Sequence, residues 1–550
     1  MSRLLIVCGP QAKARLATLL EHFPDTNGLE EYHSQQLAIA VGGGDSGVIE
    51  INGVVLALEG FVTHRAERGD RLLKTLIIDF IKNGEACVKQ WRGSFRLLIS
   101  HNGVTRIYSD QLASRAFFFT DNGFETLYCS HTAPLLAAIK TRTIDGANLL
   151  QFLHAGRFFA GGSLFTELRQ LSPGSVHRLN GIGDQRLKIF PWYEFRLENL
   201  NLHADAILPE LKARLDSAIL QHWQRADGPV LLLSGGVDSR YILNTLAELL
   251  PEDELGQLHT CLWGEPNVEP GSDAAWAARE AARHNLLFSF YPIEARIESL
   301  FNTLFATQSG MTSHVISHTD DYVWSRHLAL QGRQALLRGD ECFGPNGAEV
   351  NSREAALKRV GLGCFSDDDV SLNHAFNGQI EDWQGLHAQH IVCLSQVADE
   401  PNDVRDILYC RERLPSLNAH LNSQRAPFVE NFNPLLDPDI LDLIGQLPRH
   451  LRTDKRILRQ CFQRYYPTEG FATSGNAFNW QRLWFQPGLA EFIQDKLARL
   501  PEPFNSAYWY QVGQLLSANS QQAAKMERAS QHRAIQMACR AIVLGHWLRP

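Results

Sequence analysis

The sequence predicts a mixed α+β and α/β protein of two domains. Antiparallel sheets are expected over residues 1–195, and a doubly wound parallel sheet with added helices over residues 205–550. Short apolar runs separated by Asn-Gly turns fill the first part, which is typical of β-hairpins. Strand and helix patterns alternate in the second part, which favours a parallel sheet. An apolar strand, a glycine turn and a helix follow one another over residues 230–250, and this unit organises the second domain.

The apolar runs of the first domain are expected to pair across short turns. One helix is expected among these strands, over residues 71–83, and residues 4–7 are expected to form a strand. The runs expected to be strands are residues 48–51, 54–58, 95–99, 104–108, 117–119 and 126–130, with Asn-Gly turns at 52–53, 102–103 and 122–123. The pattern therefore predicts antiparallel sheets accompanied by helices.

A polar linker over residues 191–204 is expected to separate the two domains. The second domain is expected to begin with a helix at residues 205–221. The strands expected after it are residues 230–233, 257–263, 286–292 and 334–338, and the helices are residues 239–250 and 272–285. Ligands of such sheets bind at the carboxyl ends of the strands. The loop after Leu233 and the strand end at residues 262–264 are therefore expected to share one pocket.

The loop after the strand at 230–233 reads Ser-Gly-Gly-Val-Asp-Ser and opens a helix. Gly235 and Gly236 allow the backbone to approach a ligand closely, and the N–H groups and dipole of the helix N-terminus favour an anion. Asp238 cannot bind a phosphate directly, so a divalent cation between the two is expected. The Gly-Lys-Ser/Thr ending of a Walker loop is absent.

Composition excludes several classes of protein. A net charge of −8 without a long basic run argues against a general nucleic-acid binder. The 10 cysteines are scattered and include no Cys-x-x-Cys pair, so neither a zinc site nor a disulfide framework is indicated. No stretch reads as a signal peptide or reaches the ~18 apolar residues of a membrane span. A cytoplasmic protein with reduced thiols is expected.

The loop resembles the SGGxDS loop of the ATP pyrophosphatases, which grip pyrophosphate while ATP is cleaved between its α and β phosphates. The resemblance implies ATP and Mg²⁺ as cofactors. By similarity to asparagine synthetases, Leu233 and Trp263 would contact the adenosine, although Trp263 fits core packing equally well. The implied nucleotide-binding residues are Leu233, Ser234, Gly235, Gly236, Asp238, Ser239, Trp263 and Gly339.

A second apolar strand, residues 334–338, ends in Gly339-Asp340-Glu341-Cys342-Phe343-Gly344. This segment resembles the second phosphate loop of the asparagine synthetases, Ser-Gly-Glu-Gly-x-Asp-Glu-x-Phe-Gly. The resemblance implies that Asp340 shares the magnesium ion with Asp238. Arg338 is expected either to contact phosphate in catalysis or to cap a surface. The loop is shorter than the family's, and the glutamate implicated there in ammonia attack has no certain counterpart, which suggests a different amine.

Two further segments extend the resemblance. Residues 428–437 resemble the family's Gly-Val-Glu-x-Arg-x-Pro-Phe-Leu-Asp, with Phe432 in place of the arginine, and residues 454–459 resemble Glu-Lys-x-Ile-Leu-Arg. By this resemblance Lys455 is the active-site lysine that neutralises charge growing on the acyl phosphate and on pyrophosphate. Glu430 is expected to be either a structural ion-pair partner or a catalytic base that orients the amine.

The first domain resembles the N-terminal glutaminase domain of asparagine synthetases, an αββα sandwich of the N-terminal-nucleophile type. The segments that carry the resemblance are residues 91–95, 108–115, 127–130 and 171–174. Those glutaminases have a nucleophilic cysteine at position 2, whereas this chain has Ser2, and Glu59-Gly60 stands where Asn-Gly is common. Glutamine hydrolysis is therefore not expected. Ser2 as nucleophile, or Cys8 exposed by removal of seven residues, are the alternatives.

The resemblance to asparagine synthetases thus implies an ATP-dependent amide ligase that adenylates a carboxylate and passes it to an amine, releasing AMP and pyrophosphate. The substrates are expected to be a carboxylate and an amine, with neither nucleic acid nor membrane involved. A lasso-peptide-type macrolactam cyclase, acting on a precursor peptide with a partner peptidase, is favoured. The alternatives are a β-lactam synthetase, an asparagine synthase that uses glutamine or ammonia, and a non-catalytic ATP-binding partner.

Three other features bear on sites or mobility. His314 and His318 stand one helical turn apart near Asp321, a spacing that fits zinc, a substrate cleft or simple packing. Residues 345–400 are expected to form a mobile or substrate-covering segment. Residues 521–547 are expected to be helical.

Overall fold

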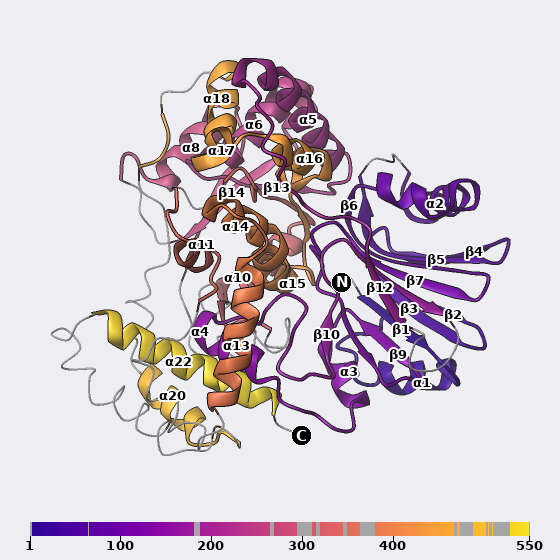
Figure 1. The fold of residues 1–550 in the computed structure, drawn as a ribbon. Helices are drawn as coiled ribbons and strands as arrows, with labels where there is room; N and C mark the ends of the chain where they lie inside the picture. Colours follow the sequence, from indigo (N-terminus) through magenta and orange to yellow (C-terminus); the bar gives the residue numbers. More distant parts are fainter. Residues whose placement is uncertain are drawn as a thin grey trace.

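The fold was analysed in a computed structural model of the chain. The structure describes residues 3–63, 65, 67–180, 187–264, 269–293, 311–314, 319–344, 349–363, 380–466, 470–473, 488–501, 504, 509 and 528–548. Figure 1 shows a two-sheet unit on the right and a parallel sheet with helices on the left. In the described part of the chain, none of the helices combines the length and the apolar composition that crossing a membrane would require.

Two six-stranded antiparallel sheets form the N-terminal unit, in the orders β10-β8-β9-β1-β3-β2 and β12-β11-β7-β6-β5-β4. The first contains β1 (Arg3–Cys8), β2 (Glu30–His33), β3 (Leu37–Gly42), β8 (Phe118–Asp121), β9 (Thr126–Cys129) and β10 (Arg169–Gln170). The second contains β4 (Gly47–Ile51), β5 (Val54–Val62), β6 (Gly93–His101), β7 (Val104–Ser109), β11 (Ser175–Asn180) and β12 (Leu187–Pro191). Positive φ angles at both residues of the Asn52-Gly53 and Asn102-Gly103 turns close hairpins at the predicted places.

Helices cover the outer faces of both sheets, which gives the αββα sandwich. Alternation along β1 shows this packing: Leu4 and Ile6 lie between the sheets, whereas Leu5 and Val7 pack under the helices. The helices are α1 (Ala12–Leu20), α2 (Gly69–Asn83) and α3 (Thr132–Ala138), with the 3-10 helix η1 (Gly84–Gln90). The predicted helix at 71–83 corresponds to α2. The expectation of a single helix among these strands was wrong, because α1 and α3 are too short for their periodicity to stand out.

The C-terminal half is built on a five-stranded parallel sheet in the order β15-β14-β13-β16-β17. Its strands are β13 (Pro229–Leu232), β14 (His259–Gly264), β15 (Phe288–Pro292), β16 (Ala335–Leu337) and β17 (Glu430–Phe432). The chain winds one way from β13 to β15 and then crosses back to β16. The strand order therefore reverses between β13 and β16, and a crevice for ligands is expected at their carboxyl ends.

Helices pack on both faces of this sheet (Figure 1). One core joins the sheet to helices such as α5, α6 and α18, and a smaller core on the other face includes Trp324 and Leu328 of α10. The helices are α5 (Ala204–Trp223), α6 (Val237–Leu249), α7 (Glu252–Leu255), α8 (Asp273–Arg283), α10 (Thr319–Leu330), α11 (Arg353–Arg359), α14 (Pro401–Leu408), α15 (Ala419–Arg425), α16 (Pro438–Gln446), α17 (Arg449–Arg452) and α18 (Arg456–Tyr465). The shorter segments are η4 (Tyr409–Asn418), η5 (Pro434–Leu436) and η6 (Thr453–Lys455).

A third helical group joins the two halves. Helices α4 (Gly146–Ala155), α13 (Ile380–Ser395), α20 (Leu489–Leu497) and α22 (Arg528–Trp547) lie together (Figure 1) and share one core with the outer face of the first sheet. The helix predicted at 521–547 corresponds to α22, with 521–527 outside the described residues. Part of the expected mobile segment at 345–400 is helical, as α11 and α13, while 345–348 and 364–379 lie outside the described residues.

A buried carboxyl connects η4 to the N-terminal half. Glu412 Oε2 accepts a hydrogen bond from the Ala160 N–H at 2.9 Å. Ser416, one turn later in η4, accepts from the Arg157 guanidinium, which is also buried. Burial raises the pKa of Glu412 to about 7, although the Ala160 N–H and the charge of Arg157 oppose the shift. The two halves thus share a titratable contact in their interface.

Replacing Glu412 with glutamine is expected to flatten the dependence of stability on pH. In wild type the folded state binds the Glu412 proton more tightly than the unfolded state, so the free energy of unfolding falls as pH rises from about 4.5 to 7. One such proton contributes at most ~1.4 kcal/mol per pH unit. A glutamine oxygen still accepts the Ala160 N–H. Urea denaturation at several pH values, with the exposed Glu381→Gln as control, measures the change; equal slopes in E412Q and wild type would contradict it.

Candidate functional site

The first phosphate-type loop lies at the carboxyl end of β13, at the reversal point of the sheet. Leu233 is buried and donates its N–H to the Cys261 carbonyl at 2.8 Å, which continues the sheet. The loop then turns into α6, whose N-cap is Gly236. Ser239 Oγ accepts the Ser234 N–H at 2.9 Å and stabilises the turn. The predicted strand, glycine turn and helix are confirmed.

The amide groups of this loop are held by side-chain oxygens. Gly235 donates its N–H to Asp273 Oδ1 at 3.1 Å, and Gly236 donates to Ser234 Oγ at 3.2 Å. Asp273 lies in the first turn of α8 and was not predicted as a site residue. A Cβ at position 235 would lie 2.5 Å from Ala472 Cβ, so glycine is required there. The N–H groups of Gly235 and Gly236 therefore donate to a carboxylate oxygen and to a hydroxyl oxygen.

The second loop approaches the first closely, as predicted. A Cβ at Gly339 would lie 2.9 Å from Asp238 Cβ and 2.9 Å from the Ser239 amide nitrogen, so only glycine allows this contact. Asp238 Oδ1 and Asp340 Oδ2 are both buried and form no hydrogen bond in the described structure. Burial raises the pKa of Asp238, and the Asp340 carboxylate adds to the rise, while Lys455 opposes it. Two carboxylates, each with one buried oxygen that accepts no hydrogen bond, therefore lie near each other.

This pair fits one magnesium ion. Mg²⁺ in nucleotide sites binds one or two carboxylates together with substrate phosphates and water. Asp238 and Asp340 each have one buried oxygen that accepts no hydrogen bond. Among the described residues, no group of three or more His, Cys, Asp or Glu side chains is arranged to hold a metal. These two oxygens are the ones that Asp238 and Asp340 would offer to such an ion.

Lys455 lies against the first loop, although 217 residues separate it from Asp238. Its Nζ is 2.6 Å from Asp238 Oδ2 and 3.1 Å from Glu341 Oε1. Asp454 and Lys455 both have left-handed backbone angles, with φ 53° and 56°. The Lys455 N–H donates to the Phe343 carbonyl at 2.9 Å, which holds this strained turn against the second loop. The structure thus brings the predicted lysine to the predicted loops.

The charge of Lys455 and those of the neighbouring carboxylates influence one another's pKa values. Burial alone would lower the pKa of Lys455, but the carboxylates of Glu341 and Asp238 raise it above its ordinary value. Burial raises the pKa of Glu341 to about 7, while Lys455 opposes the rise. Glu341 also accepts the Phe343 N–H. Lys455 therefore stays cationic, and Glu341 orients it. Glu341 lies in the segment that resembles the family's second phosphate loop, but no role was predicted for it.

Arg338 points toward Asp340. Its Nη2 lies 3.3 Å from Asp340 Oδ1, its Nη1 lies 3.5 Å from Asn422 Oδ1, and its Nε is buried without a partner in the described structure. The sequence left open whether Arg338 contacts phosphate or caps a surface. Its side chain is only 14% exposed, so it does not lie on an open surface. Tyr409 is close enough that Cys342, Glu341 and Asp340, after burial, raise the pKa of its phenol. Tyr409 was not predicted as a site residue, because it lies far from the second loop in the sequence.

Glu430 lies away from this cluster. It begins β17, at the amino end of the strand, and pairs with Ala335 at the start of β16. The loops of the first and second phosphate sites follow the opposite, carboxyl ends of the strands. Glu430 Oε1 instead accepts from Arg115 of the N-terminal half. The ion-pair interpretation of Glu430 matches this placement, and the structure does not bring Glu430 to Lys455.

Trp263 is half-buried and packs against a small hydrophobic core. Its ring stacks on Trp324 with centroids 3.8 Å apart and planes at 28°. The Arg425 guanidinium lies 5.8 Å from the Trp263 ring centroid, and Arg425 forms a buried ion pair with Asp321. Core packing therefore accounts for Trp263, and its contact with adenosine stays a prediction.

Other candidate residues lie apart from the site. His314 Nε2 contacts the Ala155 carbonyl at 2.9 Å, and burial lowers the pKa of His314 to about 3. Its neighbour His318 lies outside the described residues, and Asp321 is paired with Arg425, so no zinc ligand set forms in the described part. Cys8 is buried at the end of β1, paired with β3 and β9. Removing seven residues to expose Cys8 would remove most of a central strand. Ser2 lies outside the described residues.

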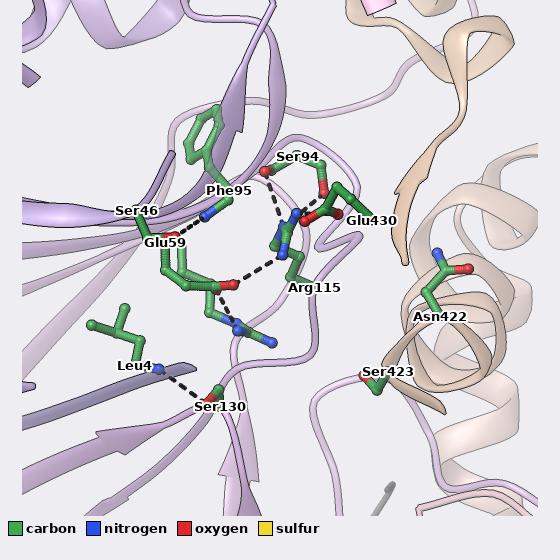
Figure 2. A network of polar contacts seen from close by, with 12 residues as sticks. Leu4, Ser46, Glu59, Ser94, Phe95, Arg115, Ser130, Asn422, Ser423 and Glu430 are labelled. Atoms are coloured by element: carbon green, nitrogen blue, oxygen red, sulfur yellow. Dashed lines mark hydrogen bonds and ion pairs between the residues drawn. The ribbon is translucent and has the colours of Figure 1, made fainter. Parts of the chain in front are cut away.

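Glu59, which stands where Asn-Gly was expected, is fully buried in a network of ion pairs (Figure 2). Its carboxylate accepts from Arg96 and, at 2.9 Å, from Arg115. Arg115 Nε also donates to the Ser94 carbonyl at 3.0 Å. Arg115 then reaches Glu430, so one arginine connects a buried carboxylate of the sandwich to β17. The network borders a cavity of about 90 Å³ between the two halves.

Comparisons with known proteins give structural similarities but no match of the sequence. No protein-family model and no curated protein matches the sequence. Among solved structures, the chain is similar to glutamine phosphoribosylpyrophosphate amidotransferase from B. subtilis (10% identity, TM-score 0.23, 52% of this chain and 65% of that chain). It is also similar to an NH3-dependent NAD synthetase from Campylobacter jejuni (12%, 0.19, 48% and 98%) and to a U34-tRNA thiolase from Methanococcus maripaludis (13%, 0.22, 59% and 82%). These TM-scores are too low to bear on function.

Proposed function

We propose that this chain is an ATP-dependent, AMP-forming amide ligase. The observation that supports the proposal best is the convergence of Asp238, Asp340 and Lys455 at the reversal point of a parallel sheet. A carboxylate oxygen of the substrate attacks the α-phosphorus of ATP, and the bond to the β-phosphate breaks, giving an acyl-adenylate and pyrophosphate. A substrate amine then attacks the acyl carbon, AMP leaves, and the amine loses a proton.

The residues of the crevice suit the first step. The N-terminus of α6 favours a phosphate anion, whose oxygens would replace Asp273 and Ser234 as acceptors of the Gly235 and Gly236 amides. When bound, Mg²⁺ would be held by Asp238 and Asp340 and would neutralise charge on phosphate oxygens. Lys455, kept cationic by Glu341 and Asp238, would neutralise the charge that grows on the departing pyrophosphate. Arg338 adds a second cation beside Asp340.

Within this class we propose a substrate amine that is not ammonia from glutamine. A lasso-peptide-type macrolactam cyclase fits a chain without a cysteine at position 2. One observation favours the alternative of a β-lactam synthetase. Those enzymes place a tyrosine near the second loop, and the charges of Glu341 and Asp340 contribute, after burial, to the raised pKa of the Tyr409 phenol. Closure of a small ring therefore stays an alternative to the peptide branch.

Pyrophosphate exchange tests the reaction class. The purified chain with ATP, Mg²⁺ and a panel of carboxylates is expected to exchange labelled pyrophosphate into ATP, and complete turnover is expected to give AMP. Aspartate-dependent exchange would support an asparagine synthase instead. Formation of ADP and inorganic phosphate, or glutamate release from glutamine coupled to product, would contradict the proposal. Absence of exchange with every carboxylate, a precursor peptide and its peptidase included, would favour a non-catalytic ATP-binding partner.

Replacing Asp340 with asparagine is expected to raise the Mg²⁺ concentration needed for half-maximal exchange by about tenfold or more, because one of two carboxylates is lost. Chelation with EDTA is expected to abolish wild-type exchange, and added Mg²⁺ to restore it. The exposed Asp382→Asn is the matched control and is expected to keep the wild-type Mg²⁺ dependence. An unchanged Mg²⁺ dependence in D340N would remove Asp340 from the metal site.

A further inference from the structure

Two cysteine side chains contact each other beside the second loop. Cys342 lies in that loop, and Cys410 lies in the first turn of η4, 68 residues later. Their Sγ atoms are 3.5 Å apart, and the two residues are 4% and 1% exposed. A thiol is a weak hydrogen-bond donor and a weak acceptor, so this contact contributes little as a hydrogen bond. The same placement brings together the two sulfur atoms that a disulfide needs.

The position of Cys342 connects the pair to the crevice. Its two neighbours in the chain both hold Lys455. Glu341 Oε1 lies 3.1 Å from Lys455 Nζ, and the Phe343 carbonyl accepts the Lys455 N–H at 2.9 Å. A covalent bond at Cys342 would therefore pull on the backbone between two contacts that position the lysine.

The other end of the pair is anchored in the interface between the two halves. Cys410 belongs to η4, in which Glu412 accepts the Ala160 N–H at 2.9 Å and Ser416 accepts from Arg157. Ala160 and Arg157 belong to the N-terminal half. Because η4 is held by these buried contacts, the second loop is the part expected to move when the sulfur atoms approach each other.

We infer that Cys342 and Cys410 form a reversible disulfide when the chain is oxidised by a peroxide, and that this bond lowers the activity of the crevice. The effect on activity rests on the proposed function, whereas formation of the disulfide does not. Where thiols are kept reduced, the disulfides that do occur are usually transient and redox-sensing.

The reaction has two steps. The sulfur of one cysteine, as thiolate, attacks a peroxide oxygen, the O–O bond breaks, and the cysteine becomes a sulfenic acid. The sulfur of the second cysteine attacks the sulfenic sulfur, the S–O bond breaks, and water leaves. Two thiols are thus oxidised to one disulfide, and hydrogen peroxide is reduced to two molecules of water.

Burial determines how fast the pair reacts. It raises the pKa of the Cys342 thiol well above its ordinary value, and the neighbouring Cys410 thiol raises it further. The thiolate is the reactive form, so oxidation of the folded chain is expected to be slow. Hydrogen peroxide is small and uncharged, which suits a buried site. The pair is therefore expected to respond to sustained oxidation.

Peptide mapping of the peroxide-treated full chain tests the inference. Free thiols are blocked in denaturant, and tryptic cleavage without reductant is expected to leave residues 339–353 linked to residues 406–411. Non-reducing electrophoresis is expected to show the linked chain at monomer mass, and dithiothreitol is expected to remove the link. The control Cys393→Ser, which removes an exposed thiol, is expected to form the same link. Absence of the linked peptide under conditions that oxidise Cys393 fully in wild type, or its formation only in urea-denatured chain, would overturn the inference.

Pyrophosphate exchange measures the effect on the crevice. Misplacing a catalytic group by about 1 Å can cost about a hundredfold in rate, so the linked chain is expected to exchange about tenfold or more slowly than the untreated chain. Dithiothreitol is expected to restore the rate. Cys410→Ala removes one sulfur of the pair, and its exchange, compared with its own untreated sample, is expected to be insensitive to the same treatment.

Two results would overturn the coupling to the crevice. One is a linked chain that exchanges at the untreated rate, and the other is an equal loss of exchange in C410A and wild type after peroxide. A reduced chain that exchanges no pyrophosphate contradicts the proposed function alone, because peptide mapping detects the disulfide without any measurement of activity.

Discussion

Replacing Lys455 with methionine is expected to lower pyrophosphate exchange by about a hundredfold to a thousandfold. A preorganised cation aimed at charge that grows in the transition state typically contributes this much. Lys455 Nζ lies 2.6 Å from Asp238 Oδ2, on the first loop. Methionine has a similar length and apolar stem, so the change removes mainly the charge. Exchange measured at saturating ATP and Mg²⁺ separates a loss of catalysis from a loss of nucleotide binding.

Two controls make the Lys455 result specific. The exposed Lys13→Met in α1 removes the same charge far from the loops and is expected to retain full exchange. Lys455→Arg keeps the charge and is expected to recover part of the activity, because the larger guanidinium does not reproduce the contacts to both Asp238 and Glu341. K455M exchanging at the wild-type rate would show that the crevice at β13 and β16 is not where ATP is cleaved.

Replacing Arg115 with methionine is expected to reduce the free energy of unfolding by about 3–5 kcal/mol, the range found when one partner of a buried ion pair is removed. Glu59 has no exposed surface and would keep only Arg96 as its charged partner. Glu430, whose side chain is 32% exposed, is hydrated and adds less. Urea denaturation followed by tryptophan fluorescence and by circular dichroism measures the loss. Because Arg115 joins the two halves, the two signals are also expected to separate.

The double variant Glu59→Gln with Arg115→Met tests the cause of that loss. Removing the stranded carboxylate together with its partner is expected to recover part of the stability, since the largest cost is an uncompensated buried charge. Arg499→Met, which breaks an exposed pair with Asp495, is expected to change stability by less than about 1 kcal/mol. A loss in R115M no larger than in R499M would show that the network does not hold the halves together.

Local sequence determined the first loop, because a strand, a glycine turn and a helix N-terminus are neighbours in the chain. The second loop and Lys455 were identified only through resemblance, and their proximity to Asp238 could not be derived from spacing. It arises because β16 lies beside β13 and because two left-handed residues, Asp454 and Lys455, turn the lysine toward the crevice. Glu341 lay within the resembling segment but was given no role, and Tyr409 lacked any local signal.

The position of Glu430 shows that a matching motif does not by itself place a residue at the site. Its neighbours in the sequence match a ligase motif, yet a strand has two ends, and Glu430 begins β17 while the crevice lies past its last residue. The partner of Glu430 is Arg115, on the other half of the chain. Pattern and spacing describe one segment at a time, so they could not indicate a contact between residues separated by 315 positions.

By itself, the sequence determined the elements whose causes are local: the Asn-Gly hairpins, the strand and glycine loop at 230–236, and the helix that begins beside it. Hydrophobic periodicity and backbone preference act over a few residues, and they suffice for these elements. Only the tertiary structure decided which charges meet. Burial in a shared interior, after sheet order is established, pairs Lys455 with Asp238 and joins Glu59 to Glu430 through Arg115.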